Sequence, residues 1–305
     1  MVDRRVEGVI APLLTPFEDD GSIADDLYGS HAKRVLSEGA HYLSPFGTTG
    51  EALSGSLAER RTTLERLVSR HGIEAARLMP GTGLCNLPET VELTRHAVAL
   101  GCAAVMVLPP FFYTAAVDDG LFVYMARLIE RVGSPDLRIC IYHIPQNAGV
   151  GFSPALSARL NKAFPDVVIA YKDSAGDWAN TRAVLEAAPG LAVFPASESL
   201  LRRGLSLGAA GCISATCNLN SRAIRELFDR TKRGETDGLG ALDDAVQRFR
   251  TVFQNAGLIE GMKAFLAART ADSRWLNVRP PLLPQTMRQG RELADAVQAL
   301  NAVDA

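Results

Sequence analysis

The chain has 305 residues, a formal net charge of −2, and 47% hydrophobic and 22% charged residues. This length suffices for one large domain or two smaller ones, and the composition is typical of a soluble globular protein. The balanced charge, without a basic stripe or an acidic tail, argues against nucleic acid or an anionic membrane as the main partner.

Five cysteines, an odd number, fit no zinc-binding spacing and stand mostly in apolar runs, where a thiol acts as a small hydrophobic group. This pattern favours a reducing compartment and predicts no metal site. The first five residues lead directly into a strand-like run, so no signal peptide is expected. No apolar run approaches the roughly 18 residues of a membrane span. We therefore expect a cytoplasmic protein without membrane contact.

Apolar runs alternate with amphipathic segments along most of the chain. Runs expected to form strands, with the loops that follow some of them, cover residues 6–17, 42–46, 78–83, 103–108, 137–144, 167–173, 192–195 and 210–215. Segments with helical spacing cover residues 25–37, 57–68, 89–100, 121–132, 154–164, 178–188, 198–207 and 221–231, and Ser153 is a plausible N-cap.

The strand-like runs are nearly all apolar rather than alternating, as is typical of parallel strands covered on both faces. Eight such strands alternating with eight helices predict an α/β fold, a closed (β/α)8 TIM barrel. An open doubly wound sheet is disfavoured because the phosphate-binding pattern G-x-G-x-x-G does not follow the first strand.

The pattern changes to helices only from residue 239 onward. Helical spacing covers residues 242–253, 258–268 and 288–300, and a rigid proline-containing stretch covers 278–284. We therefore divide the chain into a barrel, residues 1–232, and a C-terminal helical extension, residues 233–305. The extension is expected to pack on the barrel or to form a subunit contact.

Lys172 stands near the carboxyl end of the strand-like run 167–173. The other four lysines, including Lys263, stand in amphipathic helix-like surroundings, where an ammonium group is normally solvated. Burial disfavours the charged form of an amine, and a neutral amine can attack a ketone and form a Schiff base. The alternative is an ordinary lysine that pairs with Asp173 or another acid.

Site residues of such barrels lie at the carboxyl ends of the strands. This rule brings Lys172 together with Tyr142 of the neighbouring strand and with the loop 47–51, Gly-Thr-Thr-Gly-Glu. Two glycines around two threonines offer hydroxyl and N–H groups to a small carboxylate. Considered separately, the loop is equally typical of a Gly-rich turn, and Tyr142 of a core tyrosine.

Taken together, these segments resemble the family of dihydrodipicolinate synthase and N-acetylneuraminate lyase. The resemblance extends from Pro12 to about Leu283 and rests on motifs in matching order: G-T-T-G-E at 47–51, P-P-F-F-Y at 109–113, I-Y-H-I-P at 141–145, Y-K-D-S at 171–174, G-A-A-G-C-I-S at 208–214 and V-R-P-P-L at 278–282. It implies a pyruvate-dependent class I lyase that uses a Schiff base and no metal or other cofactor. It also implies a homotetramer, built as a dimer of tight dimers.

The resemblance also implies roles for individual residues. Lys172 would form the Schiff base with pyruvate or a larger 2-oxo acid, and Tyr142 would shuttle protons in contact with the Thr48 hydroxyl. A tyrosine from a neighbouring subunit would complete this relay, at the position that Tyr113 matches. Further groups would hold or line the pyruvate: Gly47, Thr49, the backbone N–H groups of Thr48 and Thr49, and the carbonyl of Ile213.

The chain departs from the synthase of the lysine pathway at Asn147. In the synthase an arginine at this place, two residues after the proline of the tyrosine motif, binds the carboxylate of aspartate semialdehyde. An amide cannot supply the charged, bidentate fork of a guanidinium. We therefore expect a hydroxylated 2-oxo acid such as a sugar acid, or an aldehyde, as second substrate, with the synthase as the alternative. Ser197 and Glu198 could add polar contacts to that substrate or could cap the helix that follows.

Two functions of other classes remain open at this point. A barrel that has lost catalysis would bind a ligand without turnover, although every matched catalytic position is intact. A phosphate-handling isomerase would need extra donors near the last strand, where Ala209, Ala210 and Cys212 offer none. We expect His143 to support Tyr142 structurally rather than to act as a catalyst.

Overall fold

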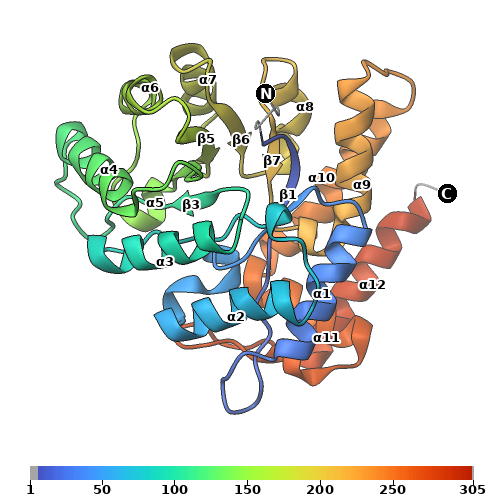
Figure 1. Cartoon of the computed structure of the whole chain (residues 1–305). Helices are drawn as coiled ribbons and strands as arrows, with labels where there is room; N and C mark the ends of the chain where they lie inside the picture. Colours follow the sequence, from blue (N-terminus) through green and yellow to red (C-terminus); the bar gives the residue numbers. More distant parts are fainter. Residues whose placement is uncertain (1–5, 304–305) are drawn as a thin grey trace.

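The computed structural model describes residues 6–303, in which parallel strands form a barrel with helices around it (Figure 1). Seven regular strands lie in this part of the chain: β1 (Gly8–Pro12), β2 (Tyr42–Ser44), β3 (Val105–Val107), β4 (Ile139–His143), β5 (Val168–Asp173), β6 (Ala192–Pro195) and β7 (Gly211–Ile213). Their ladders are all parallel and fall into two groups, in the order β2-β1-β7 and β3-β4-β5-β6.

The segment predicted as a third strand, residues 78–83, joins the two groups. It forms only two isolated parallel bridges, between Leu43 and Leu78 and between Gly81 and Met106. These bridges connect β2 on one side with β3 on the other. The prediction of a regular strand here is therefore wrong, although the segment occupies the position of one.

The irregularity of this segment has two physical causes. Pro80 has no N–H group to donate to a ladder. Gly81 approaches the loop after β2 so closely that a Cβ atom there would lie 2.1 Å from the Phe46 carbonyl oxygen. On the opposite side the barrel closes through the N–H of Ala210, which donates to the carbonyl of Val193 at 2.9 Å. The predicted TIM barrel is confirmed, with seven regular strands and one bridged segment in place of eight strands.

Helices follow the strands on the outside of the barrel: α1 (Asp25–Ser37), α2 (Leu57–Ser69), α3 (Leu87–Ala99), α4 (Asp118–Val132), α6 (Pro154–Ala163), α7 (Trp178–Ala187), α8 (Leu201–Leu205) and α9 (Cys217–Lys232). Ser153 caps α6 as predicted, since its hydroxyl accepts from the N–H of Leu156 at 3.0 Å. Short elements in the loops are too brief for a periodic pattern: α5 (Pro145–Ala148) and the 3₁₀ turns η1 (Thr48–Gly50), η2 (Ala52–Ser54), η3 (Ala75–Arg77) and η4 (Glu198–Leu200).

Side chains of the strands alternate between two apolar clusters. On β4, Ile139 and Ile141 belong to the cluster that packs against the surrounding helices. Cys140 and Tyr142 belong instead to the cluster inside the barrel, together with Ala170 of β5. Because successive side chains of a strand point to opposite faces, residues two positions apart share a face. The alternation of β4 and β5 therefore decides which polar side chains enter the barrel.

The C-terminal extension consists of α10 (Leu239–Asn255), α11 (Leu258–Thr270), the 3₁₀ turn η5 (Ser273–Leu276) and α12 (Met287–Val303). Figure 1 shows these elements gathered beside α1 and α9. A third apolar cluster, which includes Phe253, Met262 and Trp275, joins the extension to Leu14 and Leu219 of the barrel.

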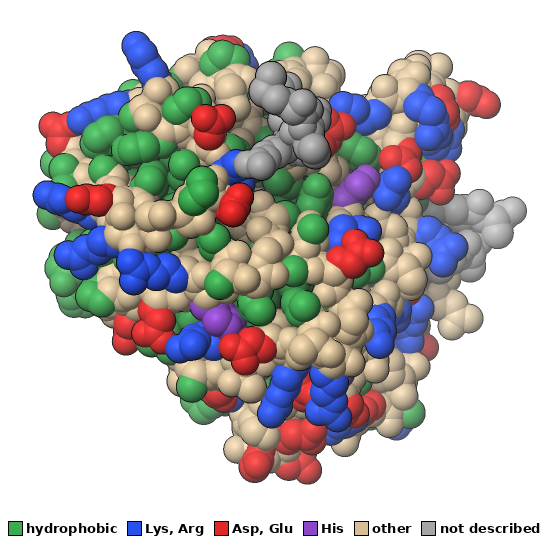
Figure 2. Space-filling model, in the orientation of Figure 1, with side chains coloured by type: hydrophobic (Ala, Val, Ile, Leu, Met, Phe, Trp, Pro, Cys, Tyr) green, Lys and Arg blue, Asp and Glu red, His purple; other side chains and the backbone are tan. Residues whose placement is uncertain are grey.

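The surface carries charges of both signs. On the face seen in Figure 2, Lys and Arg side chains are interspersed with Asp and Glu, without a large field of one sign. Within residues 6–303, no helix combines the length and the apolar character that crossing a bilayer requires.

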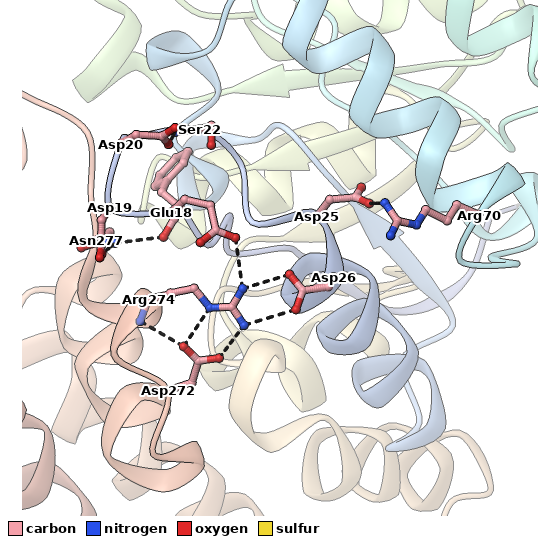
Figure 3. Close-up of polar contacts among 11 residues, drawn as sticks. Glu18, Asp19, Asp20, Ser22, Asp25, Asp26, Arg70, Asp272, Arg274 and Asn277 are labelled. Atoms are coloured by element: carbon pink, nitrogen blue, oxygen red, sulfur yellow. Dashed lines mark hydrogen bonds and ion pairs between the residues drawn. The ribbon is translucent and has the colours of Figure 1, made fainter.

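A network around Arg274 ties the extension to the loop after β1 (Figure 3). The Arg274 guanidinium binds Glu18 and Asp26, each at 3.0 Å, and Asp272 at 2.8 Å. Hydrogen bonding from Arg274 holds the pKa of the Asp26 carboxyl below its usual value. Asn277 donates to the carbonyl of Phe17 at 3.0 Å. The contacts with Glu18, Asp26 and Phe17 join segments that are about 250 residues apart in the sequence.

Asn218, at the start of α9, fixes the carboxyl end of β1. Its side chain is fully buried; the amide nitrogen donates to the carbonyl of Pro12 at 2.7 Å, and the amide oxygen accepts from the N–H of Leu14 at 3.0 Å. His31 contacts the same oxygen at 2.8 Å. One side chain thus satisfies two backbone groups that would otherwise be buried without partners.

We expect Asn218→Ala to lower the free energy of unfolding by about 2–4 kcal/mol, because the Leu14 N–H and the Pro12 carbonyl lose their partners. Urea unfolding measures the change. The matched control is Asn255→Ala at an exposed position, which should change stability by less than about 0.5 kcal/mol. Equal effects of the two substitutions would contradict the role given to Asn218.

Candidate active site

Lys172 and Tyr142 lie side by side inside the barrel. The pairing of β4 with β5 sets Tyr142 opposite Lys172. Lys172 is 3% exposed, and its Nζ lies 4.0 Å from the centre of the Tyr142 ring. The amine is therefore desolvated and next to the phenol, as the sequence predicted.

Asp173 faces the other way, toward the surrounding helices. Its carboxylate accepts hydrogen bonds from the N–H of Ala175 (3.0 Å) and from the side chains of Asn180 (3.0 Å) and Thr181 (2.7 Å). Among residues 6–303 no acid forms an ion pair with Lys172. The alternative that Lys172 is an ordinary lysine paired with Asp173 is therefore wrong.

Tyr142 connects the amine to the loop after β2. Its hydroxyl lies 3.2 Å from the Oγ1 atom of Thr48. Burial acts to raise the pKa of Tyr142, but the positive charge of Lys172 and the hydrogen bond with Thr48 outweigh burial, and the pKa lies below its usual value near 10. The phenol therefore releases its proton more readily than a tyrosine in water.

The loop 47–51 presents free backbone donors. The N–H groups of Thr48 and Thr49 donate to no other residue within the described part of the chain. Gly50 allows the loop to lie close to the end of β1, since a Cβ atom there would be 2.6 Å from the Leu13 carbonyl oxygen. Glu51 adopts a left-handed conformation with φ of 54°. Free N–H groups held in a tight turn are suited to binding a carboxylate.

A buried ion pair anchors this loop to the C-terminal extension. Lys263 of α11 donates to Glu51 at 2.6 Å, and both side chains are at most 1% exposed. The second oxygen of Glu51 accepts from the backbone N–H of Arg279 at 2.8 Å. Burial lowers the pKa of Lys263 to about 8, although the carboxylate of Glu51 opposes the shift.

The expectation that Lys263 is a solvated surface lysine is therefore wrong. Helix α11 is apolar nearly all round, with seven of its residues buried from Gly261 to Ala267. A helix of this kind is normally enclosed by protein, so its composition was a signal that the lysine is buried. Its partner could not be named from the sequence, because Glu51 is 212 residues away.

An open cavity of about 400 Å³ lies at the carboxyl ends of the strands. Its polar lining includes Gly47, Thr48 and Tyr142. Asn147, on α5, also lines it and is exposed, and its contact with a second substrate stays a prediction. The remaining lining is mainly apolar and comes from five separate segments: Leu53 of η2, Leu108 and Phe111 after β3, Ala148 on α5, Ile259 of α11, and Leu282 of the loop before α12.

Other predicted site residues are not part of this lining in the single chain; Lys172 itself lies behind Tyr142, which does line the cavity. Thr49 is buried, and Ile213 ends β7 at the same end of the barrel as Lys172. Tyr113 is 60% exposed, and its ring lies edge-on to the ring of Phe112, with 6.1 Å between the ring centres. Its contact with a neighbouring subunit remains a prediction.

Ser197 and Glu198 take the structural role that the sequence also allowed. The hydroxyl of Ser197 caps η4 by accepting from the N–H of Ser199 at 3.3 Å. Glu198 is fully buried and forms an ion pair with Arg250 of α10 at 2.9 Å. His143 stacks on Tyr171 and does not line the cavity. Within residues 6–303, no group of three or more His, Cys, Asp or Glu side chains is placed to hold a metal ion.

Comparison with known proteins gives one family. The model of the "Dihydrodipicolinate synthetase family" matches residues 5–300. An "Uncharacterized DapA-like lyase" from Chloroflexus aurantiacus is 31% identical over 298 residues, which cover 97% of each chain. A 4-hydroxy-tetrahydrodipicolinate synthase from Thermus thermophilus is 33% identical over 281 residues, 92% of this chain and 91% of the relative.

The fold comparison agrees with these matches. The crystal structure of dihydrodipicolinate synthase from Agrobacterium tumefaciens str. C58 superposes with a TM-score of 0.87. The two chains are 29% identical, and the match covers 97% of this chain and 99% of the other.

We expect Thr48→Val to raise the pKa of Tyr142. Burial raises this pKa and the hydrogen bond with Thr48 lowers it, so the pKa should rise when the hydrogen bond is lost. The phenolate absorbance of each protein is measured across a pH series. The absorbance of the same protein carrying Tyr142→Phe is subtracted, and the difference reports the titration of Tyr142. Thr62→Val, at an exposed position on α2, is the control. A pKa that falls or stays constant in Thr48→Val would contradict the assigned contact.

We expect Lys263→Met to lower the free energy of unfolding by about 3–5 kcal/mol, because it leaves the buried Glu51 carboxylate without a cation. Lys232→Met removes an exposed pair with Glu7 and should change stability by about 0–1 kcal/mol. Thermal and urea unfolding measure both. Adding Glu51→Gln to Lys263→Met should restore part of the loss; a double variant as unstable as the sum of the single variants would show that the two residues are not coupled.

Proposed function

Because this chain belongs to the dihydrodipicolinate synthetase family of lyases, we propose that it is a class I aldolase that joins pyruvate to an aldehyde or cleaves the resulting hydroxylated 2-oxo acid. The observation that carries the proposal is the desolvated amine of Lys172, unpaired with any acid among the described residues and 4.0 Å from the Tyr142 ring. Such an amine is suited to Schiff-base formation.

The proposed reaction balances without an oxidant or a reductant. The Lys172 amine adds to the ketone of pyruvate and water leaves, which gives an imine. Loss of a methyl proton gives an enamine, whose carbon attacks the aldehyde carbon, and the aldehyde oxygen takes up a proton to become a hydroxyl group. Water then hydrolyses the imine and restores the amine. Tyr142 and Thr48, 3.2 Å apart, are the proposed proton carriers.

The free N–H groups of Thr48 and Thr49 are proposed to bind the pyruvate carboxylate, with Gly47 and the Ile213 carbonyl completing the pyruvate pocket. This fixes the ketone relative to the amine and so favours attack. The lysine is the only group that would react covalently with substrate, and the proposed reaction uses no metal and no other cofactor.

A homotetramer, a dimer of dimers, is part of the proposal. Phe112 and Tyr113 are 83% and 60% exposed, and Val117 nearby is 68% exposed. Neighbouring exposed apolar side chains of this size are typical of a protein contact. In such an assembly the partner's Tyr113 would extend the relay of Tyr142 and Thr48. All five cysteines are free thiols, which suits the cytoplasmic location that we propose.

The lysine-pathway synthase is the second candidate, because the Thermus relative carries that name. Its second substrate, aspartate semialdehyde, presents a carboxylate. Asn147 stands where a cation would bind that group, and neither Lys nor Arg is among the described residues that line the cavity. This favours an aldolase of another specificity over the synthase.

Borohydride reduction in the presence of pyruvate tests the proposal. We expect one reduced pyruvate per chain, attached to Lys172, and no adduct in Lys172→Arg. Lys162→Arg, at an exposed position on α6, should label like the wild type. Peptide mass spectrometry locates the adduct. No adduct, or an adduct on Lys263, the other buried lysine, would refute the Schiff-base mechanism assigned here.

A further inference from the structure

The cavity lining combines two kinds of groups. Thr48 and Tyr142 offer the hydroxyl groups assigned to the pyruvate half of the reaction. Leu53, Leu108 and Phe111, among other residues, offer apolar side chains. A volume of about 400 Å³ is within the range of pockets that enclose whole small-molecule ligands, so space remains beside pyruvate.

The lining offers no cation to an anionic second substrate. Among the described lining residues the only charged side chain is Glu51, and its oxygens are bonded to Lys263 and to the N–H of Arg279. Lys172 is committed to the pyruvate ketone in the proposed reaction. A carboxylate or phosphate on the aldehyde would therefore lose its hydration without gaining a charged partner, which is unfavourable.

A polyhydroxylated substrate is also poorly matched. Its hydroxyl groups would face Leu53, Leu108, Phe111 and Leu282, none of whose side chains can accept or donate a hydrogen bond. The polar side chains of the lining are few. The amide of Asn147 makes no hydrogen bond with the other described residues and is free to bind one polar group of a ligand.

We propose that the aldehyde joined to pyruvate has an apolar body, which the cavity holds between Leu53, Leu108, Phe111 and Leu282, and at most one polar group, which Asn147 binds. The product is then a 4-hydroxy-2-oxo acid with an apolar substituent, whose hydroxyl group arises from the aldehyde oxygen. This inference rests on the proposed function and narrows it. It replaces the sugar acid expected from the sequence, where Asn147 was the only indication of the second substrate.

The test compares three aldehydes with pyruvate: benzaldehyde, glyceraldehyde and succinate semialdehyde, which are apolar, hydroxylated and anionic. We expect kcat/KM for benzaldehyde to exceed the other two values by at least about tenfold. Formation of each 4-hydroxy-2-oxo acid is followed by mass spectrometry. A preference for glyceraldehyde or succinate semialdehyde would overturn the inference.

A pair of variants removes the effect of different intrinsic reactivity among the aldehydes. Leu282→Gln places an amide of similar size in the apolar lining and should lower kcat/KM for benzaldehyde about tenfold relative to glyceraldehyde. Leu283→Gln changes the next residue, which is 80% exposed and outside the lining, and should leave the ratio unchanged. An unchanged ratio in Leu282→Gln would contradict the assigned contact.

Borohydride trapping with pyruvate alone separates this inference from the proposed function. An adduct on Lys172 together with poor use of benzaldehyde overturns only the apolar second substrate. The absence of an adduct overturns both. Leu282→Gln should form the pyruvate adduct like the wild type, because Leu282 is assigned to the aldehyde alone.

Discussion

The alternation of side chains along two paired strands determines the chemistry of this barrel. On β5, Ala170 and Lys172 face the interior, whereas Tyr171 and Asp173 face the helices. The parallel register sets Tyr142 of β4 beside Lys172. A shift of one residue on β5 would exchange the lysine and the aspartate between the two faces. The amine inside the barrel therefore depends on the same pattern that builds the apolar core.

Much of the fold and the centre of the site follow from local sequence patterns. Apolar runs and helical spacing predicted the barrel, and helix α1 was predicted with its observed bounds, Asp25–Ser37. Lys172, Tyr142 and Thr48 were predicted together because carboxyl ends of parallel strands meet at one end of a barrel. The segment 78–83 is not a regular strand because Pro80 lacks an N–H group and Gly81 lies against the Phe46 carbonyl. The sequence alone does not show that Gly81 and Phe46 are neighbours.

Contacts between distant segments were not predictable in this way. The pair of Glu51 with Lys263 joins the first third of the chain to the extension, and neither residue has a local pattern that names its partner. The apolar lining of the cavity is similar, since Leu53, Phe111 and Leu282 come from segments far apart in the sequence. Phe111 and Leu282 stand in motifs that carry the family resemblance, but only the fold shows that they line the same cavity.

The distribution of charge around the cavity limits what can bind there. A buried charge needs partners. Glu51 and Glu198 pair with the cations of Lys263 and Arg250, and Asp173 accepts hydrogen bonds from Ala175, Asn180 and Thr181. Lys172 has no acid partner within the described residues. An anionic keto acid would supply the missing negative charge beside it, with its carboxylate on the N–H groups of Thr48 and Thr49. A second anion would find no cation among the described residues of the lining, so the charge distribution around the cavity favours a neutral partner for the proposed keto acid.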